Sequence, residues 1–286
     1  MARAAAAFGY QNDRVPVGLL HPGEMGAAIG AGLRARGEVV LWASAGRSRA
    51  TAERADRAGL TDAGAVPELC RRCDVLVSVC PPHAAVEVAR LAAGFDGVYV
   101  DANAVSPETA RTIAGLHGRF VDGGIIGPPP LATGATRLYL SGGEAELVAE
   151  LFRGTMVDAR VLSDEPGAAS ALKMSYASWT KGSSALLLAA RALAQAEGVE
   201  DALLEEWQMS LPQLLERSAA AARSAVGKGW RWVGEMEEIA ASYAAAGLPE
   251  GFHQAAAEIY ERASADPSDD ATMERILAAI RGSRSR

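Results

Sequence analysis

The chain has 286 residues, of which 49% are hydrophobic, so it can bury one large core or two ordinary ones. Its formal net charge of −7 makes nucleic acid and anionic membranes poor candidate partners. No apolar run approaches the roughly 18 residues that a membrane helix needs. Residues 1–13 lack the layout of a signal peptide, so we expect a disordered tail there and a cytoplasmic protein.

Short apolar runs alternate with helix-like segments over residues 14–165. Strands are expected at residues 15–20, 39–42, 74–79, 97–101, 120–121 and 137–140. Helices are expected at residues 27–36, 49–58 and 84–92, and another begins at Pro107 with Ser106 as its N-cap. Strands separated by helices of this length predict a parallel sheet with helices on both faces.

Residues 166–286 form a region that reads as nearly all helical. A long helix rich in small residues is expected at 167–197, with Gly198 as its C-cap. Lys228 is expected in a glycine-rich turn between two later helices. These later helices are predicted at 201–207, 211–226, 230–246, 252–263 and 271–281. We therefore expect a domain boundary near residue 165.

The segment VGLLHPGEMGAAIG, residues 17–30, follows the first strand and opens the first helix. Gly23 and Gly26 match the second and third glycines of the dinucleotide-binding pattern GxGxxG, which lets a pyrophosphate approach the backbone at the helix N-terminus. His21 replaces the first glycine and Pro22 lacks an N–H, so either histidine tolerates this turn or the loop is reshaped. The predicted cofactor contacts of this loop are His21, Pro22, Gly23, Glu24 and Met25.

The second strand ends in LWASAGRSRAT, residues 41–51, which contains no acidic residue. Sites for NAD place an acid about 20 residues after the glycine loop, where it binds the ribose 2′-hydroxyl. Ser44, Arg47, Ser48 and Arg49 instead offer the hydroxyls and the cations that an adenosine 2′-phosphate would need. This pattern predicts NADP(H), and the alternative is a solvated basic turn.

Cysteine and lysine are both rare in this chain. The three cysteines are an odd number, and the CxxC of Cys70 and Cys73 has no second CxxC or histidine cluster to complete a metal site, so we expect reduced thiols and no metal. Only three of the 28 basic residues are lysines, at positions 173, 181 and 228. A chain that prefers arginine this strongly has reason to keep a lysine where an amine must lose a proton.

Five motifs follow one another along the chain: VGLLHPGEMG, VSVCPP, VDANAVSPET, VDGGIIGPPPLATGATRLYLSGG and GAASALKMSYASWTKG. In this order they resemble the motifs of β-hydroxyacid and 6-phosphogluconate dehydrogenases. The segment KGWRWVGEMEEIAASYAAAGLPEGFHQAAAEIY is similar to a domain of unknown function in phosphogluconate-dehydrogenase-like reductases. Imine reductases share this architecture. Together the motifs cover nearly the whole chain from about residue 14.

This resemblance implies an α/β Rossmann-type domain over residues 14–165 and an all-α domain for substrate binding and dimerisation over 166–286. It implies hydride transfer at a nicotinamide and a homodimer with interlocked C-terminal helices. Lys173 matches the family's catalytic lysine, a general acid in reduction or base in oxidation. Tyr176 shares its helix face and could hold a polar substrate group. At the ends of the preceding strands, Asn103 is expected beside both the nicotinamide and the substrate, as a catalytic residue. Cys80, Pro81 and Pro82 are expected beside the cofactor.

Two departures from the family pattern bear on the substrate. Ala177 stands where the family often has Asn, and residues 125–130, IIGPPP, replace the Ser-Gly-Gly segment that binds a carboxylate. Because Ile126 offers no side-chain donor and prolines have no N–H, we expect a more apolar wall and a carbonyl substrate with an apolar portion.

Four side chains of the helical region, Trp230, Trp232, Met236 and Tyr243, are expected in the core or in a dimer contact. His253 is expected at the surface or in a helix cap, and Lys181 outside the cleft. The main hypothesis is an NADPH-dependent reductase in which Lys173 protonates the substrate oxygen. The rival functions are imine reduction and a non-catalytic NADP(H)-binding regulator. Lys173 discriminates between them, because neither rival function needs this lysine.

Overall fold

The computed structural model describes residues 15–264 and 273–282, so the predicted tail at 1–13 lies outside the described residues. The chain forms two compact units, Met1–Lys173 and Met174–Arg286, and the division falls within the long helix α8 (Ala168–Ala196). Within the described ranges, none of the helices combines the length and apolarity needed to cross a bilayer.

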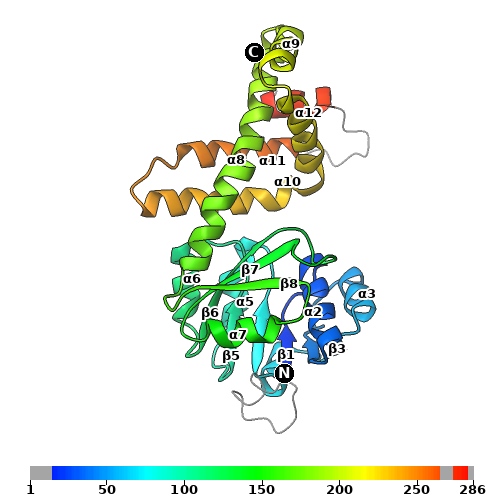
Figure 1. Ribbon diagram of the computed structural model, residues 1–286, viewed down its shortest axis with the longest axis vertical. Helices are drawn as coiled ribbons and strands as arrows, with labels where there is room; N and C mark the ends of the chain where they lie inside the picture. The colour runs from blue at the N-terminus through cyan, green and yellow to red at the C-terminus, as the bar shows by residue number, and fades with distance from the viewer. Residues whose placement is uncertain (1–14, 265–272, 283–286) are drawn as a thin grey trace. The chain divides into compact units, whose positions relative to one another are not determined.

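The N-terminal unit is built on one eight-stranded sheet (Figure 1). Its strand order is β3-β2-β1-β4-β5-β6-β7-β8. The first six strands run parallel, and β7 pairs antiparallel with β6. The strands are β1 (Pro16–Leu19), β2 (Val39–Trp42), β3 (Thr61–Asp62), β4 (Val75–Ser78), β5 (Val98–Asp101), β6 (Phe120–Ile126), β7 (Thr136–Ser141) and β8 (Val157–Ser163).

Helices cover both faces of this sheet. One face packs against α2 (Glu24–Arg36), α3 (Arg49–Arg57) and α7 (Ala145–Phe152). The other face packs against α4 (Val66–Arg72), α5 (Ala85–Leu91), which follows the short 3-10 turn η1 (Pro82–Ala84), and α6 (Pro107–Ala114). Because β4 is buried on both faces, its Val75, Leu76 and Val77 are all apolar, as in a typical central parallel strand.

The predicted Rossmann-type sheet followed by an all-α region is confirmed, with two local corrections. The sheet is not purely parallel, because β7 returns antiparallel to β6. The sequence reading also missed α4, α7, β3 and β8. The two missed strands are edge strands with exposed or alternating polar residues, which lack the continuous apolar run of a buried strand.

Ser106 caps α6 as predicted, since its hydroxyl oxygen accepts the Thr109 N–H at 3.1 Å. The predicted NADP turn contains a second such cap. The Ser48 hydroxyl accepts the Thr51 N–H at 3.3 Å and begins α3.

In its described part, the C-terminal unit contains most of α8, followed by α9 (Glu200–Ser210), α10 (Gln213–Ala245), α11 (Gly251–Ala263) and α12 (Met273–Arg281). The predicted turn around Lys228 is wrong, because α10 runs through it without a break. Gly229 is buried there, and a Cβ on it would lie 3.2 Å from the carbonyl oxygen of Tyr260 and from Ser264 Cβ. The glycine therefore permits close approach of α11 to α10 rather than a turn, and Lys228 is an exposed helix residue.

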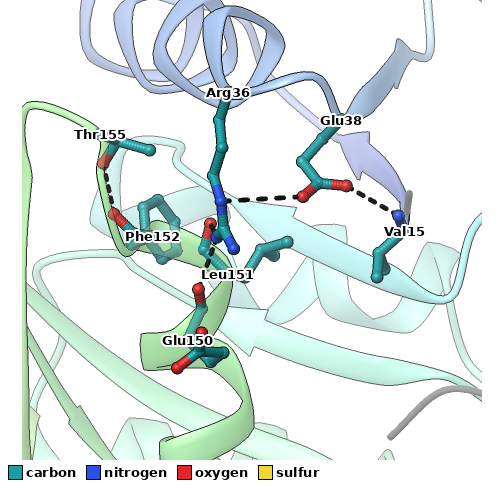
Figure 2. Close-up of polar contacts among 7 residues, drawn as sticks. All are labelled: Val15, Arg36, Glu38, Glu150, Leu151, Phe152 and Thr155. Carbon is teal, nitrogen blue, oxygen red and sulfur yellow. Dashed lines mark hydrogen bonds and ion pairs between the residues drawn. The ribbon is translucent and has the colours of Figure 1, made fainter. Parts of the chain in front are cut away.

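A buried ion pair ties together the end of α2, the start of β2 and the end of α7 (Figure 2). The Arg36 side chain is 6% exposed, and its guanidinium donates to the carbonyls of Glu150 and Leu151 in the last turn of α7. Its Nε lies 4.0 Å from Glu38 Oε1, while Glu38 Oε2 accepts the Val15 N–H at 2.7 Å. Arg36 thus gives the Leu151 carbonyl a donor at the helix end, and gives the Glu150 carbonyl a donor in addition to the Arg153 N–H.

Candidate functional site

The glycine loop lies where the strand order of the sheet reverses, between β1 and β4, which is the usual ligand site of an open parallel sheet. Gly23 is the N-cap of α2, and no side chain caps this helix. A Cβ on Gly23 would meet no atom within 4 Å, whereas one on Gly26 would collide with the carbonyl oxygen of His21. The space beside Gly23, at the start of α2, is therefore open, whereas Gly26 is packed tightly against the loop backbone. Glu24 is exposed in that turn and Met25 is half-buried.

His21 fits this turn without strain. No non-glycine residue among those described has a positive φ, so histidine tolerates the turn and the loop needs no glycine here. Burial, assisted by the positive charge of Arg47, lowers the pKa of His21 to about 4, so its imidazole is neutral at pH 7. Its buried Nδ1 has no hydrogen-bond partner among the described residues. Pro22 is buried beside it.

Arg47 lies half-buried at the end of β2, as a 2′-phosphate ligand would require. Burial lowers the pKa of its guanidinium, and its buried Nε has no hydrogen-bond partner within the described chain. The Ser44 carbonyl accepts the Arg47 N–H at 3.0 Å and holds the turn. The Ser48 hydroxyl already accepts the Thr51 N–H at the start of α3, so a ligand that binds this hydroxyl would do so alongside the helix cap.

Arg54 is a second cation at the glycine loop, and the sequence reading missed it. Its Nε lies 3.4 Å from the carbonyl oxygen of Pro22, and its Nη2 donates to Thr51 Oγ1 at 3.1 Å. The available signal was helical spacing, because Arg54 follows Thr51 by three residues on α3.

Asn103 joins the carboxyl ends of β4 and β5. Its Oδ1 accepts the Cys80 N–H at 2.6 Å, and its Nδ2 donates to Ser78 Oγ at 3.1 Å. Its own N–H donates to Asp101 Oδ1 at 2.9 Å. Asn103 is 3% exposed, so its side chain holds the two strand ends in place. Its predicted role at the substrate stays a prediction.

Cys80, Pro81 and Pro82 follow β4 at this same edge. Burial, with the Asp101 charge adding to it, raises the pKa of Cys80 to about 12, so the thiol stays protonated at pH 7. The CxxC thiols behave alike, since burial raises the pKa of Cys73 to about 12 and also raises that of Cys70. All three cysteines are free. Protonated, partly buried thiols are poor redox nucleophiles.

Asp122 fixes the start of α8. Its carboxylate is 1% exposed and accepts hydrogen bonds from the Gly167 N–H at 3.0 Å and the Ser170 N–H at 2.9 Å. It also accepts the hydroxyls of Ser170, at 2.6 Å, and Ser141, at 2.9 Å. Ser141 Oγ in turn accepts the Ala169 N–H at 3.0 Å. A negative charge at a helix N-terminus is also favoured by the helix dipole.

Lys173 lies one turn after this anchor, half-buried against Gly124 of β6. A Cβ on Gly124 would lie 2.6 Å from the carbonyl oxygen of Ala169 and 3.1 Å from Lys173 Cβ, so only glycine leaves room for α8 here. Strand register aligns Asp122 with Asp101, the last residue of β5. Gly124 therefore lies beyond the end of β5, at the edge that also carries Asn103.

Beyond Gly124, β6 continues with apolar residues, and the apolar substrate wall expected here stays a prediction. Ile126, two residues further along β6, is 5% exposed and lies on the same strand face as Gly124. Pro128, Pro129 and Pro130 follow it, and Leu131 is 81% exposed.

The remaining candidates lie in the C-terminal unit. Tyr176 is 47% exposed on α8, and its substrate role stays a prediction. Lys181 forms a mostly buried ion pair with Glu235, and its Nζ lies 5.4 Å from the centre of the Trp232 ring. The prediction that His253 is a surface or capping residue is wrong, because it is 3% exposed.

His253 packs against the Tyr243 ring at 4.3 Å, and Gly182 leaves space for it on α8. Met236 is fully buried, as expected, whereas Trp230 is 58% exposed. No group of three or more metal-ligating side chains occurs within residues 15–264 and 273–282.

Residues 194–263 match the family model of a domain of unknown function, DUF1932. Among solved structures, a conserved protein of unknown function with structural similarity to 3-hydroxyacid dehydrogenases aligns at 29% sequence identity and a TM-score of 0.62. The alignment covers 93% of this chain and 96% of that one. No curated protein sequence matches the chain significantly.

Two enzymes share the fold at lower identity. The 3-hydroxyisobutyrate dehydrogenase of Mycobacterium tuberculosis, solved with L-serine, has 19% identity and a TM-score of 0.67, over 94% of this chain and 99% of that one. A reductive aminase from Aspergillus terreus, in complex with NADPH and ethyl levulinate, has 20% identity and a TM-score of 0.55, over 93% and 99%. The predicted resemblance to the β-hydroxyacid dehydrogenase architecture is confirmed.

Proposed function

We propose that the protein is an NADP(H)-dependent oxidoreductase that transfers hydride between a nicotinamide and a carbonyl or hydroxy substrate. The observation that carries this proposal is the placement of Lys173. Its stem lies on Gly124, beyond the end of β5, at the strand edge where the open glycine loop also lies. An amine and a helix N-terminus at one strand edge suit proton transfer beside a bound dinucleotide.

The residues at the loop fit this cofactor. The first turn of α2 has free N–H groups and an open Gly23 to receive a pyrophosphate, and Arg47 and Arg54 offer cations for a 2′-phosphate. The unpartnered Arg47 Nε and His21 Nδ1 are polar atoms that a bound ligand could satisfy. When bound, the cofactor supplies or accepts the hydride.

The chain's own residues supply the proton and the pocket. Lys173 donates a proton to the substrate oxygen in reduction and accepts it in oxidation. Asn103 holds the carboxyl ends of β4 and β5 together at this edge. Ile126 and the three prolines after it favour a substrate with an apolar portion over a small hydroxy acid. The reductive aminase, which was solved with NADPH, supports a nicotinamide cofactor.

Screening tests this proposal. NADPH binding is first confirmed by fluorescence titration, and NADPH oxidation is then followed at 340 nm with a panel of aldehydes, ketones, oxo acids and cyclic imines. Turnover of a carbonyl supports the proposal. Turnover of imines alone favours imine reduction, and NADPH binding without any turnover favours the regulatory alternative.

Removing either cation at the loop should weaken NADPH binding selectively. We expect Arg47→Ala and Arg54→Ala each to raise the Kd for NADPH about 10- to 100-fold, because one charge-assisted bond contributes about 1.5–3 kcal/mol. The Kd for NADH should change little, since NADH has no 2′-phosphate. Calorimetric titration with both cofactors measures this. The control is Arg90→Ala on α5, whose exposed side chain pairs with Glu87. Equal losses for NADPH and NADH would contradict the assignment.

We also propose a homodimer whose seam runs along α8. Apolar and small side chains recur at the 3-4 spacing of a coiled coil, at Tyr176, Trp179, Ser183, Leu186, Ala190 and Leu193. The large ones are exposed: Trp179 by 69%, Leu186 by 54% and Leu193 by 64%. A groove of about 290 Å³ opens among this stripe, Leu214 and Arg217. Soluble monomers rarely expose such a stripe, and a second copy of α8 would cover it.

Light scattering tests the dimer. Leu186→Glu should halve the molar mass, because a carboxylate cannot be buried unpaired in an apolar seam. The matched control is Leu91→Glu, which changes an equally exposed leucine on α5 and should leave the mass unchanged. A monomeric wild-type chain would overturn this proposal.

A further inference from the structure

We propose that Asp122 and Gly124 are positioning residues that set where the Lys173 amine stands, through the first turn of α8. The inference rests on the proposed role of Lys173 for its effect on turnover, but the position of the amine can be tested without any substrate. All the contacts involved lie within the N-terminal unit.

Asp122 contacts the backbone of α8 directly. The N–H groups of Gly167, just before the helix, and of Ser170, in its first turn, donate to one carboxylate oxygen. The Ser141 hydroxyl donates to that same oxygen and accepts a third N–H, that of Ala169. These three attachments within four residues fix both the rotation and the height of the helix at its start, one turn before Lys173.

Gly124 sets the distance between the helix and the sheet. It is two residues from Asp122 on the same face of β6, and the space above it is filled by the Ala169 carbonyl oxygen and Lys173 Cβ. An added methyl group would have to push α8 outward, and the lysine would move with it. Asp122 thus fixes the helix along its axis, and Gly124 fixes how close it lies to the sheet.

Asparagine at position 122 separates geometry from charge. The amide oxygen has two lone pairs and can accept the two backbone N–H groups of Gly167 and Ser170, and the amide nitrogen can donate to Ser170 Oγ. Asp122→Asn should therefore keep the position of α8, whereas Asp122→Ala removes every attachment at this oxygen. Gly124→Ala disturbs the same position without changing any charge.

The chain's three lysines allow a direct measurement. Protein labelled with [ε-¹³C]lysine gives three cross-peaks in a ¹H–¹³C correlation spectrum, assigned by single Lys→Arg variants. We expect Asp122→Ala and Gly124→Ala to shift the Lys173 cross-peak and leave those of Lys181 and Lys228 in place. Asp122→Asn and the control Gly118→Ala, whose added Cβ would meet no atom within 4 Å, should leave all three in place.

Turnover provides the second readout. With the aldehyde or ketone of the panel that reacts fastest, Asp122→Ala and Gly124→Ala should lower kcat at least 10-fold and toward 100-fold, because a shift of about 1 Å in a catalytic group has effects of this size. The KM for NADPH should stay within threefold, and Asp122→Asn should recover most of kcat. Loss of stability alone would give neither a fall in kcat at an unchanged KM nor the recovery of kcat in Asp122→Asn.

The outcomes separate the two proposals. A Lys173 cross-peak that stays in place in both Asp122→Ala and Gly124→Ala overturns the positioning role. If Asp122→Ala does not fold, Gly124→Ala decides the question. An Asp122→Asn variant as impaired as Asp122→Ala also overturns it, since charge would then matter more than position. A shifted cross-peak with unchanged kcat would support the positioning role and contradict the proposed role of Lys173.

Discussion

Replacing Lys173 with methionine is expected to lower turnover of a carbonyl substrate by 100-fold or more, while NADPH still binds with its wild-type affinity. General acid catalysis typically contributes 10²- to 10⁴-fold to a rate. Methionine keeps an unbranched apolar stem, so packing against Gly124 and the start of α8 should survive. The measurements are kcat from NADPH oxidation at 340 nm and Kd from NADPH fluorescence.

Lys173→Arg is the matched control for charge. Arginine keeps the cation but does not give up its proton at any accessible pH, so it should be about as inactive as methionine. Activity that survives in Lys173→Arg would mean that the residue acts through its charge. Imine reduction that survives in Lys173→Met would favour the imine reductase hypothesis, because an imine carries its own basic nitrogen.

Replacing Arg36 with methionine is expected to destabilise the N-terminal unit by about 3–5 kcal/mol, the usual effect of removing one partner of a buried ion pair. Arg36 and Glu38 are 6% and 2% exposed in their side chains. The substitution would leave the Glu38 carboxylate buried without its cation and the Leu151 carbonyl without the Arg36 donor (Figure 2). The Glu150 carbonyl would keep only the Arg153 N–H. Urea unfolding gives the free energy, and hydrogen exchange at β1 and α7 shows whether the loss is local.

Two controls accompany this measurement. Arg49→Met removes an exposed ion pair, with side chains 93% and 49% exposed, and should cost less than about 1 kcal/mol. The double variant Arg36→Met with Glu38→Gln removes both charges and should recover part of the loss, because no buried charge is then unpaired. An Arg36→Met variant as stable as Arg49→Met would show that the buried pair contributes little.

Much of the fold could be predicted because its signals are local. The runs at residues 39–42 and 97–101 are apolar enough to be central strands, and Ser106 followed by Pro107 marks a helix start that the structure confirms. The glycine loop was recognised because a strand, a tight turn and a helix N-terminus follow each other within a dozen residues. Lys173 was identified by its motif and by the rarity of lysine in the chain.

Features that depend on distant partners were missed. Asp122 lies 45 residues before Gly167 and 48 before Ser170, so no local pattern shows that it caps α8. Arg54 reaches Pro22 across 32 residues. Gly229 was interpreted as a turn residue, but it lies within α10, and its lack of a side chain lets Tyr260 and Ser264 pack closely against this helix. The helix there continues because packing against α11 outweighs the low helix propensity of two glycines.

The sequence by itself determined the class of the fold, the place of the glycine loop and the choice of Lys173, because backbone propensity, hydrophobic period and residue type are properties of short segments. Only the tertiary structure decided how these parts meet. It placed Gly124 under α8, Asp122 at its first turn and Arg36 at the end of α7. Asp122 and Arg36 bond backbone groups of a helix far away in the chain, and Gly124 leaves room for the backbone of such a helix. These contacts exist only once the sheet has assembled.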